Sequence, residues 1–335
     1  MKIMRKVISL FSLLILGIVV GACGGSKNKS SKANFENELE LVKAPLFNAD
    51  SAYHYVNTQV LFGPRVPNTE GHKLCGVYLE NKLKEFGATV TTQEVDLIAF
   101  DGTVLEAKNI IGAYQPEKKK RVVLFAHWDT RPWSDNDADE KNYNTPVLGA
   151  NDGASGVGVL LEIARLIQKE QPNLGVDIVF FDAEDYGAPQ FYKGPHEEEY
   201  WGLGSQYWSR NPHITDYNAR FGILLDMVGD KDAQFYYEGY SNEFAKSINK
   251  KVWKKAHELG FQHYFIKELG GYITDDHLFV NKIARIPTID IIHNNIHHTG
   301  FAESWHTVND TMDNIDKNTL QAVGQTVLEV IFNEK

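Results

Sequence analysis

Residues 121–126 read RVVLFA and are followed directly by His127. Three further blocks of the same kind occur at 176–181 (VDIVFF), 221–225 (FGILL) and 286–292 (IPTIDII). Each block is short, apolar and rich in β-branched and aromatic side chains, as is typical of strands buried on both faces of a parallel sheet. The run at 121–126 is therefore predicted to be a central strand of such a sheet.

Helical patterns separate or flank these blocks. They lie at 71–86, 154–168, 241–259 and 317–332, and residues 93–104 are expected to form outer strands. Because strand and helix alternate along the chain, the sequence predicts an α/β fold. The central sheet should be mixed but largely parallel, with helices on both faces.

The composition is that of an ordinary globular enzyme. The chain has 335 residues, an apolar share of 43% and a charged share of 23%, so a single catalytic domain over residues 35–335 is the simplest interpretation. The formal net charge of −10 argues against nucleic acid as a partner, since phosphate binding needs clustered Lys and Arg. A monomer is the default expectation.

The N-terminus has the pattern of a lipoprotein signal. Basic residues precede an apolar stretch at 7–20 that is short for a membrane span. We therefore predict a signal peptide over residues 1–22, a lipidated Cys23 and a flexible tether over residues 23–34. These features imply attachment to a membrane of the bacterial cell envelope, at the periplasmic or outer-membrane face. An uncleaved anchor helix or a simple secretory peptide is the alternative.

After Cys23 the chain contains one more cysteine, Cys75, so the mature chain cannot form an intramolecular disulfide. Cys75 is expected to be a small buried residue of the helix at 71–86. A further amphipathic helix is predicted from Phe35 onward.

Acidic and histidine residues gather at the predicted strand ends. Because the carboxyl ends of parallel strands meet at one edge of a sheet, these side chains should converge there. Mixed imidazole and carboxylate ligands suit catalytic zinc, although each residue alone has a structural explanation such as a helix cap or a core hydrogen bond. The set comprises His127, Asp129, Asp182, Glu184, Asp185 and Asp226, with Asp152 before the helix at 154–168 and His306 before the last helix.

Several short motifs occur in order: 127–131 (HWDTR), 149–156 (GANDGASG), 181–185 (FDAED), 225–227 (LDM) and 305–307 (WHT). Together they resemble the zinc-dependent family M28, which includes bacterial aminopeptidases and glutaminyl cyclases. The segments 62–67 (FGPRVP), 201–205 (WGLGS) and 275–277 (DDH) resemble the glutaminyl-peptide cyclotransferases of Bacteroidetes within that family. The resemblance covers residues 35–335.

For a cyclase, the resemblance implies one zinc ion bound by Asp152, Asp185 and His306, with Glu184 as the acid/base group. Position 185 is glutamate in many relatives, so the shorter aspartate requires a small shift of the metal or of the strand end. Aminopeptidases of the family hold a second zinc ion through His127 and Asp226, with Asp152 as the bridging ligand. Two zinc ions are therefore implied if the chain is an aminopeptidase.

The cyclase reaction implied by this resemblance converts the N-terminal glutamine of peptides and proteins to pyroglutamate with release of ammonia. Asp226 and Asp276 would then orient the amine and the leaving amide, and Trp305 would pack on the glutamine side chain. A di-zinc aminopeptidase is the alternative, and a non-catalytic peptide-binding lipoprotein is a remote one.

Two long polar loops, 130–149 and 187–201, follow strand ends and are expected to form the rim of the site. Trp128, Trp133 and Trp201 flank the same edge. The sequence leaves open which of these three tryptophans lines the pocket.

Overall fold

The computed structural model describes residues 43–298 and 300–335. The predicted signal peptide, the lipidated Cys23, the tether and the helix from Phe35 lie outside the described residues. The described residues form one compact unit. In the part of the chain that the structure describes, no helix combines the length and apolar character that crossing a membrane requires.

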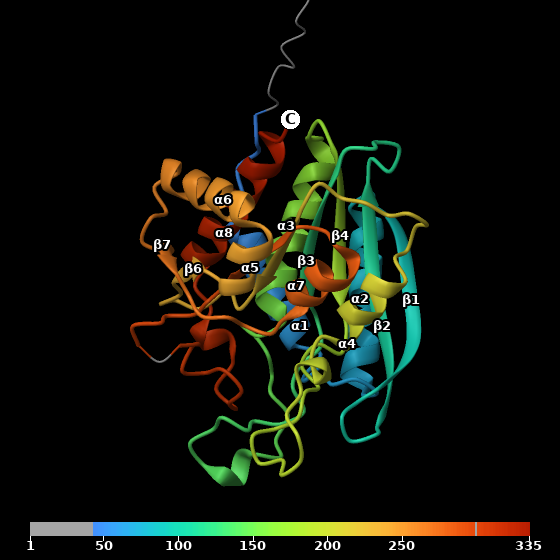
Figure 1. Cartoon of the computed structure of the whole chain (residues 1–335), viewed down its shortest axis with the longest axis vertical. Coiled ribbons are helices and arrows are strands. Elements are labelled where there is room, and N and C mark those ends of the chain that lie inside the picture. Colours follow the sequence, from blue (N-terminus) through green and yellow to red (C-terminus); the bar gives the residue numbers. More distant parts are fainter. Residues whose placement is uncertain (1–42, 299) are drawn as a thin grey trace, which may run out of the picture. The chain divides into compact units, whose positions relative to one another are not determined.

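A six-stranded mixed sheet with the order β1-β2-β4-β3-β5-β8 forms the centre of the fold (Figure 1). The four strands from β4 to the β8 edge are parallel to one another, and β1 and β2 form an antiparallel hairpin that joins the sheet at β4. The predicted strands and the α/β class are confirmed, with a tight turn inside the outer segment predicted at 93–104. The strands are β1 (Thr89–Ile98), β2 (Val104–Tyr114), β3 (Arg121–His127), β4 (Gly175–Phe181), β5 (Gly222–Asp226) and β8 (Thr288–Ile292).

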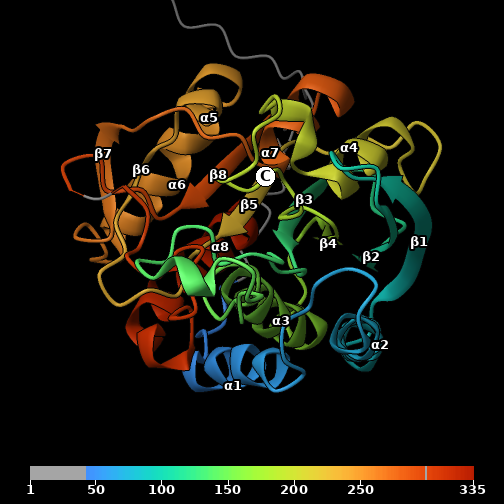
Figure 2. The same ribbon diagram turned by 90° about the horizontal axis from the view of Figure 1, so that it is seen from below.

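Helices cover both faces of this sheet, as predicted (Figure 2). Helices α1 (Ala49–Val60), α2 (Glu70–Glu85), α3 (Ala154–Lys169) and α8 (Lys317–Phe332) pack on one face. Helices α4 (Leu203–Arg210) and α7 (Asp276–Phe279) lie on the other face. The β8 edge is flanked by α5 (Gly239–Phe244), α6 (Lys246–Glu258) and the short strands β6 (Phe235–Tyr237) and β7 (Phe265–Leu269).

The prediction of a single helix at 241–259 is wrong in one respect. The structure has two helices, α5 and α6, which are separated at Ala245. Ala245 has φ −136°, which is outside the helical range. The first turn of α5 is tied to the sheet, since the backbone N–H of Asp290 in β8 donates to Ser241 Oγ at 2.9 Å. Helix α6 packs instead on α8, so α5 and α6 are oriented by contacts with different elements.

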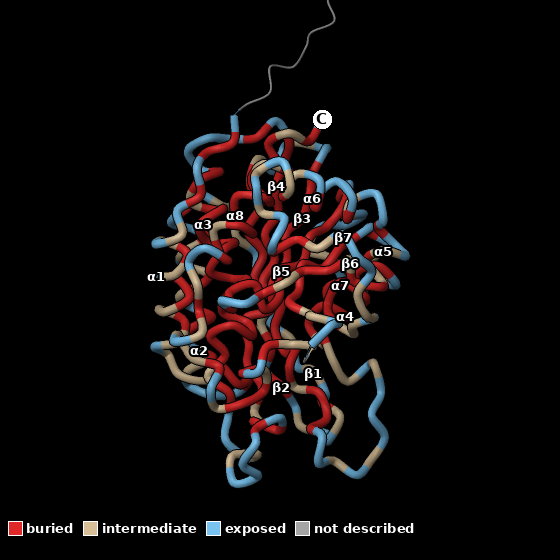
Figure 3. The backbone as a smooth tube through the Cα atoms, turned by 90° about the vertical axis from the view of Figure 1, so that its left-hand side faces the viewer, coloured by how far each residue is buried: buried red, intermediate tan, exposed pale blue. Residues whose placement is uncertain are grey.

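Two hydrophobic cores lie on either side of the sheet. Val122 and Leu124 of β3 belong to the larger core beneath α1, α3 and α8, and Val123 and Phe125 belong to the smaller core with Trp208. This alternation follows from the two-residue period of a strand. Figure 3 shows that the central strands are buried along their length, whereas the loops at one end of the molecule are exposed.

Cys75 is buried in the larger core, as predicted, and burial raises the pKa of its thiol to about 12. The thiol is therefore protonated at neutral pH and poorly nucleophilic.

Helix α3 approaches β5 so closely that it tolerates no side chain at Gly156. A Cβ atom there would lie 2.1 Å from the carbonyl oxygen of Leu225. We predict that Gly156→Ala lowers the free energy of unfolding by about 1–3 kcal/mol, the usual cost of overpacking. Gly271→Ala is the control, since its Cβ would meet only Asn294 Nδ2 at 3.6 Å. Urea denaturation of both variants checks this, and equal stabilities would contradict it.

Candidate active site

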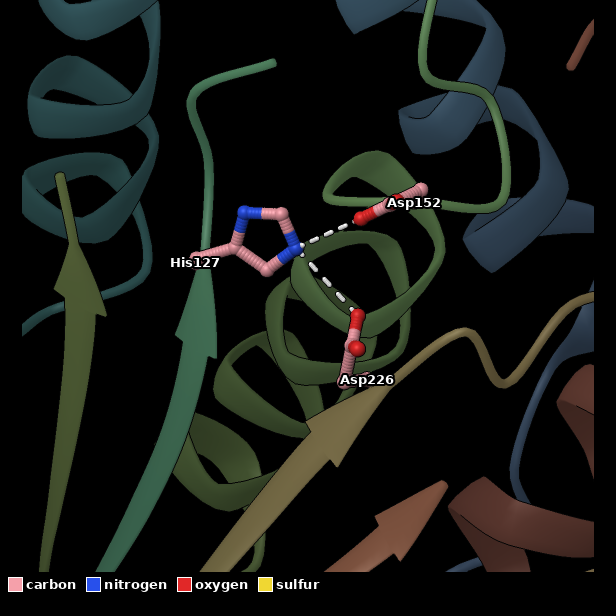
Figure 4. Close-up of side chains that lie close together, drawn as sticks. All are labelled: His127, Asp152 and Asp226. Atoms are coloured by element: carbon pink, nitrogen blue, oxygen red, sulfur yellow. Dashed lines mark hydrogen bonds and ion pairs between the residues drawn. The ribbon is translucent and has the colours of Figure 1, made fainter. Parts of the chain in front are cut away.

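The predicted site residues converge at the carboxyl edge of the sheet. His127 and Asp226 are the last residues of β3 and β5, and Glu184 and Asp185 follow closely after β4. Asp152 lies two residues before α3. Figure 4 shows His127, Asp152 and Asp226 pointing toward one another from three separate elements.

Two clusters share the carboxylate of Asp152. In the first, His127 Nε2 lies 3.0 Å from Asp152 Oδ1 and 3.2 Å from Asp226 Oδ1 (Figure 4). In the second, His306 Nε2 lies 3.5 Å from Asp152 Oδ2 and 3.2 Å from Asp185 Oδ1. In both clusters all three ligand atoms lie within 4.8 Å of one another, and all five residues are buried. The structure therefore brings together both of the predicted ligand sets.

The backbone is unusual at three positions around this edge. Ala183, Met227 and His306 have φ values of 52°, 47° and 55°, in the left-handed region that non-glycine residues rarely adopt. Ala183 directly precedes Glu184, and Met227 directly follows Asp226. Such strain persists only where surrounding contacts hold it, and here it accompanies the site residues.

Buried carboxylates hold the loops that carry the site. Asp129 accepts hydrogen bonds from the backbone N–H groups of Glu184 and Asp185, both at 3.1 Å. Asp310 accepts from the backbone N–H of Asp152 at 3.0 Å. Asp129 was among the residues selected from the sequence, whereas Asp310 was missed because it follows no strand. Its role is visible only from the contact with the loop before α3.

Arg131 provides positive charge behind the second cluster. Its Nε and Nη2 atoms each donate to the carboxylate of Asp135 at 2.7 Å, and Nη1 donates to the carbonyl oxygen of Asp185 at 3.1 Å. Asp135 in turn lies 3.6 Å from His306 Nδ1. The guanidinium group also lies 4.9 Å from the ring centre of Trp201. This contact set fixes two metal-ligand candidates and one tryptophan together.

A cavity of about 260 Å³ opens beside the two clusters. Its lining includes three carboxyl groups and one imidazole, and much of the apolar part is aromatic. The charged and imidazole groups are those of Glu184, Asp226, Asp275 and His306, and the remaining lining residues are Trp201, Met227, Tyr272, Ile273, Thr274, Ile292, Phe301 and Trp305.

The structure decides which tryptophans line this cavity. Trp305, predicted to contact substrate, lines it and stacks on the ring of His306 at a centroid distance of 3.8 Å. Trp201 also lines it, with its ring nearly parallel to that of His306. Neither of the other two candidates is among the lining residues, since Trp128 is buried in the larger core and Trp133 packs on neighbouring aromatic rings.

One predicted residue lies elsewhere. Asp276 was expected to orient substrate, but it is Asp275 that lines the cavity. Asp276 is fully buried and interacts with Ser205 of α4. Asp275 caps α7 by accepting a hydrogen bond from the backbone N–H of Asp276. Adjacent carboxylates cannot be told apart in a sequence, because their directions depend on how the helix cap turns.

The electrostatics of the edge are dominated by burial. Burial raises the pKa of Glu184 well above its usual value, and Asp275 and Asp185 raise it further against the opposing effect of His127. Burial also raises the pKa of Asp226, to about 7. Asp152 behaves oppositely, since the two histidines outweigh burial and lower its pKa.

These residues fit a zinc ion. So many buried carboxylates at one point are costly unless cations or protons compensate them. The Asp152, Asp185 and His306 set offers one imidazole and two carboxylates, a donor set that zinc accepts. Of the two clusters, only this one has its histidine, His306, lining the cavity.

A mixed α/β sheet whose strand ends carry two histidine and carboxylate clusters joined by one aspartate has the architecture of a metal-dependent enzyme. The comparison with known families makes this more specific. The chain belongs to peptidase family M28, whose model matches residues 109–331.

Solved structures extend the similarity over the described fold. A Bacteroides thetaiotaomicron glutaminyl cyclase bound to N-acetylhistamine is 69% identical and has a TM-score of 0.87, covering 88% of this chain and 100% of that chain. A leucine aminopeptidase precursor from the same organism is 68% identical with a TM-score of 0.86 and the same coverage. The resemblance to Bacteroidetes glutaminyl cyclases of this family is thus confirmed, although the two names differ in activity.

Among curated relatives, the aminopeptidase YwaD of Bacillus subtilis is 27% identical over 289 residues. That match covers 80% of this chain but only 54% of the relative. Our chain thus spans about half the length of this relative, and the activity has to be argued from the site itself.

Metal removal should destabilise the protein measurably. A ligand present at 100 times its dissociation constant stabilises a fold by about 2.7 kcal/mol, so we expect zinc to raise the unfolding temperature and a chelator to reverse this. Asp152→Asn and His306→Ala should abolish the zinc-dependent shift. His297→Ala is the control, because its side chain is 61% exposed, pairs with Glu268 at 3.1 Å and belongs to neither cluster. Calorimetry measures the shift in unfolding temperature. A shift that persists in both ligand variants would contradict the assignment.

Proposed function

We propose that this protein is a glutaminyl-peptide cyclotransferase that converts N-terminal glutamine to pyroglutamate. One observation carries the proposal: the aromatic-walled cavity presents Glu184, Asp226 and Asp275 beside His306 of the candidate zinc cluster. Peptides with an N-terminal glutamine bring an ammonium group and a carboxamide that can donate to these carboxyl groups. The cavity thus matches both polar ends of the substrate.

Zinc would be held by Asp152, Asp185 and His306, and when bound it would polarise the γ-carbonyl group of the substrate. Asp226 and Asp275 line the cavity and would receive the α-amine and the leaving amide. Trp305 would pack on the methylene groups of the glutamine side chain. These contacts bring the amine and its own carboxamide into one compact geometry, which favours ring closure.

Glu184 would move the proton. As the α-nitrogen bonds to the γ-carbonyl carbon, it must lose a proton, and the departing amide nitrogen must gain one before the C–N bond breaks. A single carboxyl group can do both, and the pKa of Glu184 is raised by burial, as suits a group that takes up a proton and returns it. The products are pyroglutamate and ammonia, and no water or external nucleophile is consumed.

The polar lining also explains why a glutamine side chain suits the cavity better than leucine does. An aliphatic side chain would remove water from the three carboxyl groups without offering them a donor. Leaving buried polar groups unpaired costs about 1–3 kcal/mol each, which disfavours such a substrate.

An M28-type aminopeptidase is the second candidate, and one observation favours it. Asp152 contacts His127 through Oδ1 and His306 through Oδ2, as a carboxylate bridging two metal ions would. Two zinc ions per chain and release of free leucine would support it. The cyclase proposal instead expects one zinc ion per chain, measured by elemental analysis of the purified protein.

We further infer that the enzyme acts in the cell envelope, held by a lipid on Cys23. The pattern of residues 1–23 supports this proposal. Metabolic labelling with a fatty acid tests it, since Cys23→Ala should lose both the label and the membrane association.

The decisive activity test compares a Gln-initiated peptide with a Leu-initiated peptide, using a soluble form that lacks residues 1–23. We expect ammonia release from the first and no free leucine from the second. Glu184→Gln should lower kcat by about 10²- to 10⁴-fold, the usual contribution of a general acid/base, while the zinc content stays unchanged. Glu258→Gln is the control, because Glu258 pairs with Lys254 and Lys255 of its own helix and does not line the cavity. Leucine release without ammonia would refute the cyclase proposal.

A further inference from the structure

A third buried cluster lies directly behind the cavity wall. Asp275, His277 and Asp290 bring their ligand atoms within 4.8 Å of one another, and all three residues are buried. They come from the N-terminus of α7 and from the middle of β8. Only Asp275 also lines the cavity, so the cluster leads from the interior of the protein to the substrate site.

Glu238 anchors the far end of this cluster. Its Oε1 accepts the backbone N–H groups of Tyr240 and Ile273, and its Oε2 accepts the N–H and hydroxyl groups of Ser241. His277 Nε2 adds a bond to Oε2 at 2.8 Å. With five donors, this carboxylate is fixed in place. Burial alone would raise the pKa of Glu238, but His277 and Ser241 outweigh it and hold it at about 2, so the group is an anion.

His277 lies between the carboxyl groups of Glu238 and Asp290. Burial lowers the pKa of His277, but Glu238, Asp275 and Asp226 together raise it above its usual value, which favours the protonated ring beside the Glu238 anion. Its other nitrogen, Nδ1, lies 3.7 Å from Asp290 Oδ2. Ser241 links the two ends a second time, because its hydroxyl donates to Glu238 and accepts the backbone N–H of Asp290. Glu238 therefore holds the His277 ring beside Asp290 and, through Ser241, holds the backbone of Asp290.

Asp290 faces Asp275. No N–H or hydroxyl group of the described residues donates to either carboxyl oxygen of Asp290, which leaves Asp275 and His277 as its neighbours. Burial raises the pKa of Asp290 well above its usual value, and the facing Asp275 raises it further. A hydrogen bond between the two carboxyl groups raises the pKa of Asp290 and lowers that of Asp275, so Asp290 is the donor of the pair. The Oδ2 atom of Asp275 is buried and accepts no N–H or hydroxyl donor among the described residues, although Asp275 lines the cavity.

We propose that Glu238, His277 and Asp290 are positioning residues that hold Asp275 in the orientation that receives the substrate amine. This inference rests on the proposed cyclase function for its kinetic consequence. The residues act through Asp275 and do not line the cavity. Their loss should therefore slow the chemical step more than it weakens binding.

Kinetics of matched variants test the proposal. Glu238→Gln and His277→Asn should lower kcat by about 10- to 100-fold, while KM changes by less than about threefold. Glu238→Asp, which keeps the anion, should recover part of the rate. His213→Asn is the control, since His213 is part-buried and accepts the Trp208 indole N–H at 3.2 Å but neither lines the cavity nor belongs to the cluster.

Substitutions at Asp290 distinguish a positioning role from a purely structural one. Asp290→Asn keeps a neutral donor for Asp275 and should retain most of the activity, whereas Asp290→Leu should behave like His277→Asn. Equal losses in the two Asp290 variants would overturn the proposal. Two metal ions per chain in the wild-type protein, with one in His277→Asn, would assign the cluster to a metal and overturn it as well.

Crystal structures provide a readout that does not depend on cyclase activity. The Asp275 carboxylate should be rotated or disordered in Glu238→Gln and unchanged in Asp290→Asn. An Asp275 side chain that keeps its orientation in Glu238→Gln would refute the positioning role. A wild-type protein that releases no ammonia would refute the cyclase function alone, because the structural comparison would still stand.

Discussion

The structure depends on one electrostatic constraint: many carboxyl groups are buried at the carboxyl edge of a largely apolar sheet. Asp152 lies at the centre of this constraint, since His127 and His306 contact its two oxygens. A buried carboxylate is costly unless a cation or a donor compensates it. Compensation comes from the two histidines, the backbone donors and the predicted zinc ion. The loops around the edge place these groups beside the carboxylates.

The buried carboxylates of the site fall into two groups, and each group has a different role. Arg131 and Asp129 hold the loop after β4, and Asp310 holds the loop before α3, so the metal-ligand candidates stay in place. Glu184 and Asp275 differ from these groups because they line the cavity and retain raised pKa values. Fully paired carboxylates therefore position the site, whereas the incompletely paired ones remain free to exchange protons with a substrate.

Prediction from the sequence succeeded where the signal was periodic or local. The central strand at 121–126, the helix at 154–168 and the convergence of His127, Asp185 and Asp226 all follow from apolar blocks that end in polar residues. It failed where tertiary contacts decide. The helix predicted at 241–259 is broken because Ser241 is bonded to β8.

By itself the sequence determined the α/β class, the order of the strands along the chain and the set of residues that reach one edge, because hydrophobic period and strand ends are properties of neighbouring residues. Only the tertiary structure decided that Asp275 rather than Asp276 faces the cavity, and that Trp201 rather than Trp128 lines it. It alone also revealed the chain of contacts from Glu238 to Asp275. The direction of a side chain and its hydrogen-bond partners depend on groups that are distant in sequence. A local sequence pattern therefore cannot predict them.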